Sequence, residues 1–160
     1  MRNIDKALKH GLTVYENAGT SEIVSMFRNT AGGSVKRITS RHYRKIETLI
    51  NYCLANELGQ ILGCYTPEGI LCAAVFLVTT HRRSIYILPC STAEGKEKRA
   101  MFMLIDYYIK SNSGKNLVLD FEGSNIEGIA RFFKGFGATA CEYFTVKRNR
   151  LPFFIRLLKR

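Results

Sequence analysis

One stretch of the sequence, residues 84–138, constrains the fold more than any other. Two short apolar runs rich in β-branched and aromatic residues lie at 84–90 and 116–121, and each predicts a strand. Between them, apolar residues recur at helical spacing up to about Lys110, and a second helix is predicted over 126–135. A strand, a crossover helix and another strand predict two parallel neighbouring strands. In such a unit the ligand crevice lies beyond the carboxyl ends of the strands.

The rest of the chain supplies the flanking elements of a single domain. A short helix is expected over 1–11, a core over 12–147 and a basic amphipathic tail over 148–160. In the core, the expected order is strand, two helices, three antiparallel strands, helix, strand, helix and a final strand over 140–147. The expected fold class is α/β (α+β), a mixed sheet of six to seven strands flanked by about four helices.

The balance of charges indicates an anionic partner. Lys and Arg outnumber Asp and Glu by 24 to 13, which gives a net charge of +11 and favours coenzyme phosphates, nucleic acid or an acidic surface. No apolar run approaches the roughly 18–20 residues of a transmembrane segment, and the N-terminus has no secretory signal, so a cytoplasmic protein is expected. The five cysteines form no C-x-x-C pair, so reduced thiols and no metal site are expected.

The predicted order of elements resembles the GNAT acyltransferase superfamily over residues 12–147. The segments 119–124 (Leu-Asp-Phe-Glu-Gly-Ser) and 128–134 (Gly-Ile-Ala-Arg-Phe-Phe-Lys), followed by Phe-Gly-Ala at 136–138, resemble the Fem-type branch more specifically. That branch includes the aminoacyltransferases of peptidoglycan bridges. The opening segment 2–12 resembles the beginning of the second half of that family, whose members usually carry two GNAT-like halves. The resemblance implies transfer of an acyl group from acetyl-CoA or another acyl-CoA to an amine.

The loop after the first strand of the central unit is the predicted coenzyme site. The N–H groups and dipole at the start of the following helix favour phosphate binding there. In GNAT enzymes this place holds the pyrophosphate loop Arg/Gln-x-x-Gly-x-Gly/Ala. Matching Gly95 to its central glycine leaves Thr92 and Glu97 as departures from the pattern. An ordinary loop with an acidic first helical turn is the alternative. The cofactor-binding residues predicted in this loop are Ala93, Glu94, Gly95, Lys96 and Lys98.

Two carboxylates at the end of the second strand of the unit are candidates for acid–base chemistry. Asp120 and Glu122 are two residues apart, so both can project to one side. Glu122 is the candidate general base; the alternative is that Asp120 hydrogen-bonds the following loop. By the resemblance, Tyr143 is the candidate proton donor to the leaving thiolate, and the backbone N–H near Leu88 polarises the carbonyl. The resemblance also assigns Asn125 to the coenzyme site, with a simple helix N-cap as the alternative.

Three hypotheses on function follow from these residues. The first is a GNAT-fold acyltransferase that uses acyl-CoA and an amine. The second is a non-catalytic or half-enzyme Fem-like module that binds an anionic partner, such as an aminoacyl-tRNA, or another subunit. The third is an aminoacyl-tRNA-dependent transferase, which the net charge suits. A homodimer is predicted from the apolar side of the end of the tail, 153–160, with packing on its own sheet or on an acidic membrane surface as alternatives.

Overall fold

The computed structural model describes residues 2–34, 38–123, 125–144 and 146, which contain one mixed sheet. The five strands follow the sheet in chain order: β1 (Thr13–Glu16), β2 (Gly59–Tyr65), β3 (Leu71–Thr80), β4 (Arg83–Ser91) and β5 (Val118–Asp120). The pairs from β1 to β4 are antiparallel, whereas β4 and β5 are parallel. The prediction of two parallel neighbouring strands in the central unit is therefore confirmed.

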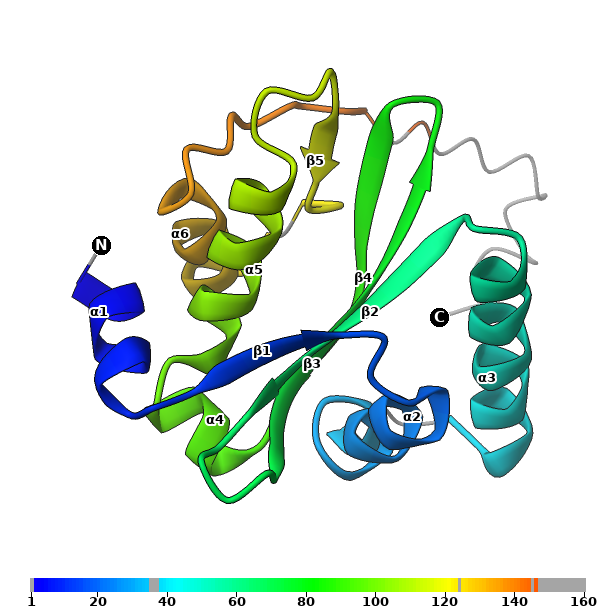
Figure 1. The fold of residues 1–160 in the computed structure, drawn as a ribbon. Coiled ribbons are helices and arrows are strands. Elements are labelled where there is room, and N and C mark those ends of the chain that lie inside the picture. Colours follow the sequence, from blue (N-terminus) through cyan, green and yellow to red (C-terminus); the bar gives the residue numbers. More distant parts are fainter. Residues whose placement is uncertain (1, 35–37, 124, 145, 147–160) are drawn as a thin grey trace, which may run out of the picture.

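Helices cover both faces of this sheet. In the described residues they are α1 (Arg2–Lys9), α2 (Thr20–Asn29), the short 3-10 helix η1 (Gly32–Ser34), α3 (Ser40–Ala55), α4 (Ala93–Glu97), α5 (Ala100–Ser111) and α6 (Glu127–Lys134). Figure 1 shows α1, α5 and α6 on one side of the sheet and α2 and α3 on the other. The six α-helices exceed the predicted four, in part because Arg99 has a left-handed backbone, with φ of 64°, that separates α4 from α5. No helix of these described segments is long and apolar enough to cross a membrane.

The central strand β3 divides the core into two layers. Its side chains alternate between the faces of the sheet, so Val75 and Leu77 join the cluster under α5, whereas Ala74 and Phe76 join the cluster under α2 and α3. All four side chains are buried. An almost wholly apolar strand predicts this central position, because both of its faces must be covered.

Along its second half, the strand β4 has no pairing with β5, and a bulge interrupts its pairing with β3. Leu88 and Pro89 together oppose Val75 in a β-bulge, and Leu88 has a left-handed φ of 54°. Proline lacks the N–H that a regular ladder needs, which favours an interruption at this position. On the other edge, β5 ends where Asp120 pairs with Ile85. The carboxyl end of β4 therefore continues past β5, and a crevice opens beside it.

The prediction of six to seven strands is wrong for the described residues, because no strand forms at 140–144. The reason lies at the end of β5. The Asp120 carboxylate accepts a 2.9 Å hydrogen bond from the Glu122 N–H, and Glu122 and Gly123 both have left-handed backbones, with φ of 62° and 78°. This turn takes the chain out of the sheet after a strand of three residues. So short a strand offers few backbone groups for a further strand within the same chain.

Aromatic side chains fix α6 against β5 and α5. Phe121 stacks on Phe133 with ring centroids 4.5 Å apart, and Phe102 contacts Phe132 edge to face at 4.7 Å. Phe136 lies 5.2 Å from Phe132. Such pairs add stability beyond the area that they bury. The aromatic residues of the Fem-like pattern therefore pack α6 in place, which sets one wall of the crevice.

Candidate functional site

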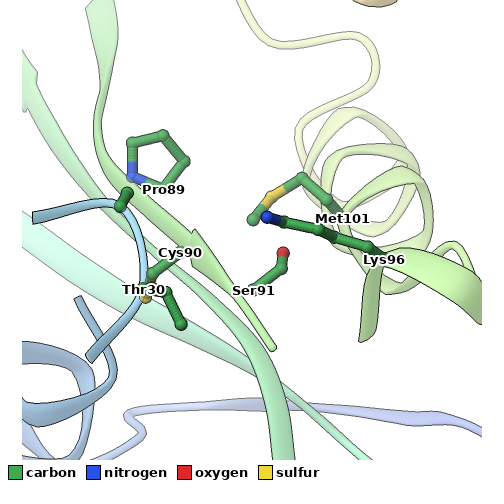
Figure 2. Close-up of a pocket in the computed structure, with 7 residues that line it drawn as sticks. Thr30, Pro89, Cys90, Ser91, Lys96 and Met101 are labelled. Carbon is green, nitrogen blue, oxygen red and sulfur yellow. The ribbon is translucent and has the colours of Figure 1, made fainter. Parts of the chain in front are cut away.

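Two cavities meet at the carboxyl end of β4, beside the start of α5. The first, of about 170 Å³, is lined by Thr30, Ala31, Pro89, Cys90, Ser91, Lys96 and Met101. The second, of about 470 Å³, is lined by Ser91, Gly95, Lys96, Arg99, Met101, Phe102, Gly128, Ile129 and Phe132. Because they share Ser91, Lys96 and Met101, we treat them as one groove, the β4–α5 groove. Figure 2 shows the Lys96 and Met101 side chains on the side of the first cavity opposite Pro89 and Cys90.

The short helix α4 is held on β3 by Thr92. The Thr92 hydroxyl accepts a hydrogen bond from the Gly95 N–H at 3.0 Å and donates one to the Cys72 carbonyl at 3.2 Å. The Thr92 N–H donates to the same carbonyl at 2.9 Å. Gly95 is buried, and a Cβ on it would overlap the Cys72 carbonyl group. The Lys96 N–H donates to the Thr92 carbonyl, so two amides of the predicted phosphate cradle already have acceptors within the chain.

The basic side chains of this region divide into two groups. Lys98 does not line the groove, and its ammonium lies 2.6 Å from the Glu94 carboxylate, a contact that raises the pKa of Lys98. Lys96 lines both cavities and Arg99 lines the second. In the described part of the chain neither Lys96 nor Arg99 forms an ion pair. The positive charge available to a ligand in the groove is therefore that of Lys96 and Arg99.

The bulge of β4 forms the floor of the first cavity. Leu88 itself does not line the cavity, but Pro89 and Cys90 do. The Cys90 thiol donates a 3.5 Å hydrogen bond to the Ala74 carbonyl, and burial raises the pKa of Cys90 to about 12. Cys90 is thus a neutral thiol at physiological pH and is not an activated nucleophile.

The predicted catalytic residues lie outside the groove lining. Asp120 accepts the Glu122 N–H and forms a 2.6 Å ion pair with Arg83, and these two contacts hold the pKa of Asp120 below its usual range. The alternative assigned Asp120 to the loop at 123–125, whereas the hydrogen bond that it accepts comes from Glu122, the residue before that loop. The side chains of Glu122, Asn125 and Tyr143 are exposed, and none of them lines either cavity. Their catalytic and coenzyme roles stay predictions, as do those of Leu88, Ala93, Glu94 and Lys98.

The N-terminus of α6 also differs from the prediction. Ile126 is the N-cap residue, and the helix begins at Glu127. Asn125 therefore precedes the cap by one residue, in an exposed bend.

The groove has walls that the sequence did not identify as functional. In the second cavity the large apolar side chains come from α5 and α6, and they are Met101, Phe102, Ile129 and Phe132. Helical spacing indicates buried positions on α5, but it does not distinguish a core position from one that lines a groove. Among the described residues that line the groove there is neither a carboxylate nor a histidine. In the described segments, no three His, Cys, Asp or Glu side chains lie close enough together to hold a metal ion. The groove suits an elongated ligand with one anionic and one apolar part.

Comparison with known proteins supports the fold. No protein-family model matches the sequence, and no curated protein matches it significantly. A predicted acetyltransferase with acetyl-CoA from Clostridium acetobutylicum is 12% identical, with a TM-score of 0.65 over 86% of this chain and 96% of that one. AAC(6')-Iy in complex with a CoA bisubstrate analogue is 9% identical, with a TM-score of 0.63 over 88% and 99%. An acetyltransferase of the GNAT family from Staphylococcus aureus is 15% identical, with a TM-score of 0.60 over 88% of each chain.

These similarities confirm the α+β GNAT-like fold, and several of the structures that share it are described as acetyltransferases. At this level of identity the similarity establishes the fold alone, because one fold supports many functions. The narrower resemblance to the Fem-type branch is not addressed by these structures and stays a prediction. Function must be inferred from the groove itself.

Proposed function

We propose that the chain binds an acyl-CoA in the β4–α5 groove and transfers its acyl group to an amine. The observation that carries this proposal is the position of Lys96 and Arg99, which line an apolar groove beside the bulged end of β4. Two cations next to apolar walls suit a ligand that joins a diphosphate to a long, mostly uncharged arm. Structures of the same fold that hold acetyl-CoA or a CoA analogue support the choice of this ligand class.

The proposed reaction needs few groups from the protein. The amine nitrogen attacks the thioester carbonyl carbon, the C–S bond breaks, and the coenzyme leaves as a thiolate that takes up a proton. We assign the polarisation of the carbonyl to the backbone N–H of Leu88, which lies in the bulge. Glu122 is the proposed base that removes the proton from the amine, and Tyr143 is the proposed donor to the thiolate. Because the residues that line the groove include neither of them, binding and chemistry need separate tests.

Coenzyme binding is tested by thermal unfolding and calorimetry with acetyl-CoA. A ligand at about 100 times its Kd stabilises the folded state by about 2.7 kcal/mol, so the midpoint must rise. The double variant Lys96→Ala with Arg99→Ala should raise the Kd at least about tenfold and reduce its salt dependence. Arg41→Ala with Lys45→Ala, two exposed positions on α3, is the matched control because it removes the same charge from the opposite face of the sheet. An unchanged midpoint with millimolar acetyl-CoA would contradict the proposal.

A non-catalytic module that binds an anionic ligand or partner is the second candidate. It is favoured by the described part of the groove lining, which contains two cations and neither a carboxylate nor a histidine. Release of free CoA thiol from acetyl-CoA, with a panel of amines as acceptors, separates the two candidates. The assay uses the Cys141→Ser variant, because Cys141 is exposed and the other four cysteines are buried. Binding without amine-dependent thiol release identifies the module, and amine-dependent release identifies the transferase.

A further inference from the structure

Two buried cysteines lie side by side on the neighbouring strands β2 and β3. Cys64 belongs to β2 and Cys72 to β3, and both are free thiols with exposed fractions of 0% and 1%. Cys64 pairs with Ala73, whereas the next residue, Tyr65, pairs with Leu71. Cys72 is therefore the extra residue of a β-bulge, directly beside Cys64.

Hydrogen bonds join the two thiols. The Cys72 thiol donates to the Cys64 carbonyl at 3.3 Å, and the Cys64 thiol is itself hydrogen-bonded to the Cys72 sulfur. This second hydrogen bond lowers the pKa of Cys72 and raises that of Cys64. Burial and the Glu94 carboxylate oppose the lowering at Cys72, and the Lys98 ammonium adds to it. Cys72 is thus the thiol of the pair that loses its proton more readily, and the thiolate is the form that oxidants attack.

The position of the pair suits a disulfide bond. Facing residues of antiparallel strands have Cα atoms about 4.5–5.5 Å apart, inside the range of roughly 4.4–6.8 Å found for disulfides. Both side chains lie on the face of the sheet that α5 covers. Cys53 and Cys90 belong to the cluster on the opposite face, so the sheet separates them from this pair.

Helix α4 lies directly over Cys72. The Cys72 carbonyl accepts two hydrogen bonds from Thr92, and a Cβ on Gly95 would lie 3.5 Å from the Cys72 Cβ. A disulfide brings two sulfur atoms from hydrogen-bond contact to about 2.05 Å, and it removes the hydrogen bond from Cys72 to the Cys64 carbonyl. The main chain at Cys72 must shift to allow this, and the carbonyl that supports α4 shifts with it.

We propose that hydrogen peroxide joins Cys64 and Cys72 in a disulfide bond and that this bond loosens α4 at the wall of the β4–α5 groove. The Cys72 thiolate attacks one peroxide oxygen, the O–O bond breaks, and the leaving hydroxide takes up a proton, which leaves Cys72 as a sulfenic acid. The Cys64 sulfur then attacks the Cys72 sulfur, the S–O bond breaks, and water leaves with the Cys64 proton. The two thiols lose two electrons and two protons, and one peroxide becomes two waters. This inference does not depend on coenzyme binding in the groove.

The count of free thiols after peroxide treatment tests the disulfide in the full chain. The Cys141→Ser variant removes the exposed thiol and leaves the four buried ones. The folded protein is treated with hydrogen peroxide and then unfolded with an alkylating agent. We expect Cys53 and Cys90 to be alkylated, and Cys64 and Cys72 to be alkylated only after reduction with dithiothreitol. Retention of all four thiols, or equal loss at Cys53 and Cys90, overturns the proposal.

Mass spectrometry then identifies the bond. Cleavage after Glu57 and Glu68 places Cys64 and Cys72 on different peptides and separates both from Cys53. The disulfide should therefore appear as two joined peptides that dithiothreitol separates. With Cys72→Ala, the Cys64 thiol should stay free under the same treatment. Oxidation of Cys72 to a sulfinic acid without the joined peptides contradicts the pairing.

Hydrogen exchange tests the effect on α4. In the reduced protein the Gly95 N–H donates to the Thr92 hydroxyl, and the Lys96 N–H donates to the Thr92 carbonyl. We expect both amides to exchange at least about threefold faster in the oxidised protein. Peroxide-treated Cys72→Ala is the matched control, because it meets the same oxidant without the disulfide, and its exchange should not change. Unchanged exchange in a protein that carries the disulfide overturns the proposed loosening of α4.

Discussion

Gly95 is the residue whose replacement by alanine best tests how the groove is held together. The new methyl group would overlap the Cys72 carbonyl group, and its distance to the carbonyl carbon would be only 2.8 Å. The obstruction is main chain of the central strand β3, so it cannot rotate away as a flexible side chain can. Helix α4 must therefore move off the sheet.

The energetic consequence follows from the contacts that this movement breaks. Thr92 donates two hydrogen bonds to the Cys72 carbonyl, from its N–H and from its hydroxyl, and each contributes roughly 0.5–1.5 kcal/mol. Overpacking of a tight contact costs roughly a further 1–3 kcal/mol. The better helix propensity of alanine offsets about 1 kcal/mol of this loss. We expect Gly95→Ala to lower the free energy of unfolding by about 2–4 kcal/mol.

Urea denaturation measures this change. With a slope of about 2 kcal/mol/M, the midpoint should fall by about 1–2 M, and acetyl-CoA binding should weaken because α4 carries Lys96. Gly128→Ala is the matched control, because a Cβ at Gly128 meets no atom within 4 Å and this glycine also lies in a helix that lines the groove. Its stability should stay the same or rise by up to about 1 kcal/mol. A Gly95→Ala protein as stable as the wild type would refute the close packing of α4 on β3.

Three further outcomes are expected. The Glu122 N–H and Arg83 hold the pKa of Asp120 low, so the stability from this carboxylate is present at neutral pH and is lost as pH falls from the unfolded-state pKa through the lower folded-state pKa. Asp120→Asn should therefore flatten the decline in urea midpoint below about pH 5, and parallel curves would contradict this. Arg99→Gly should raise the free energy of unfolding by up to about 1 kcal/mol, because glycine adopts the left-handed conformation of this residue without strain. The same variant should bind acetyl-CoA more weakly in calorimetry, and unchanged binding would exclude Arg99 from the site. Thr92→Val should cost about 1–2 kcal/mol in urea denaturation through the lost cap, and no loss would argue against the cap.

The order of elements was predictable from the sequence because the central unit contains two recognisable patterns, short apolar runs typical of buried strands and apolar residues at helical spacing. Apolar runs at 84–90 and 116–121 flank a helical pattern. The structure has parallel strands there, one that covers the whole first run and one that lies within the second. The apolar run that became β3 likewise predicted a strand covered on both faces, which its burial confirms. These signals are strong because they depend on many residues whose burial repeats with a fixed period.

The break between α4 and α5 was not predictable in the same way. It depends on one residue, Arg99, whose left-handed backbone divides a stretch of good helix formers. Arginine seldom adopts this conformation, so no local pattern indicates it. The different positions of the basic side chains around this break were not predicted from the sequence either. Lys98 forms an ion pair with Glu94, whereas Lys96 and Arg99 line the groove.

The position of the carboxylates depended on the length of β5, which no pattern in the sequence sets. A strand reaching 121 would extend the pairing of β5 further along β4, toward the end where the groove lies, and carry Glu122 with it. Instead β5 ends at Asp120 opposite Ile85, while β4 continues to Ser91. The separation of Glu122 from the groove lining follows from this difference in length, because the Asp120 turn takes the chain out of the sheet. Coenzyme binding and acid–base chemistry must therefore be measured as independent properties of this chain.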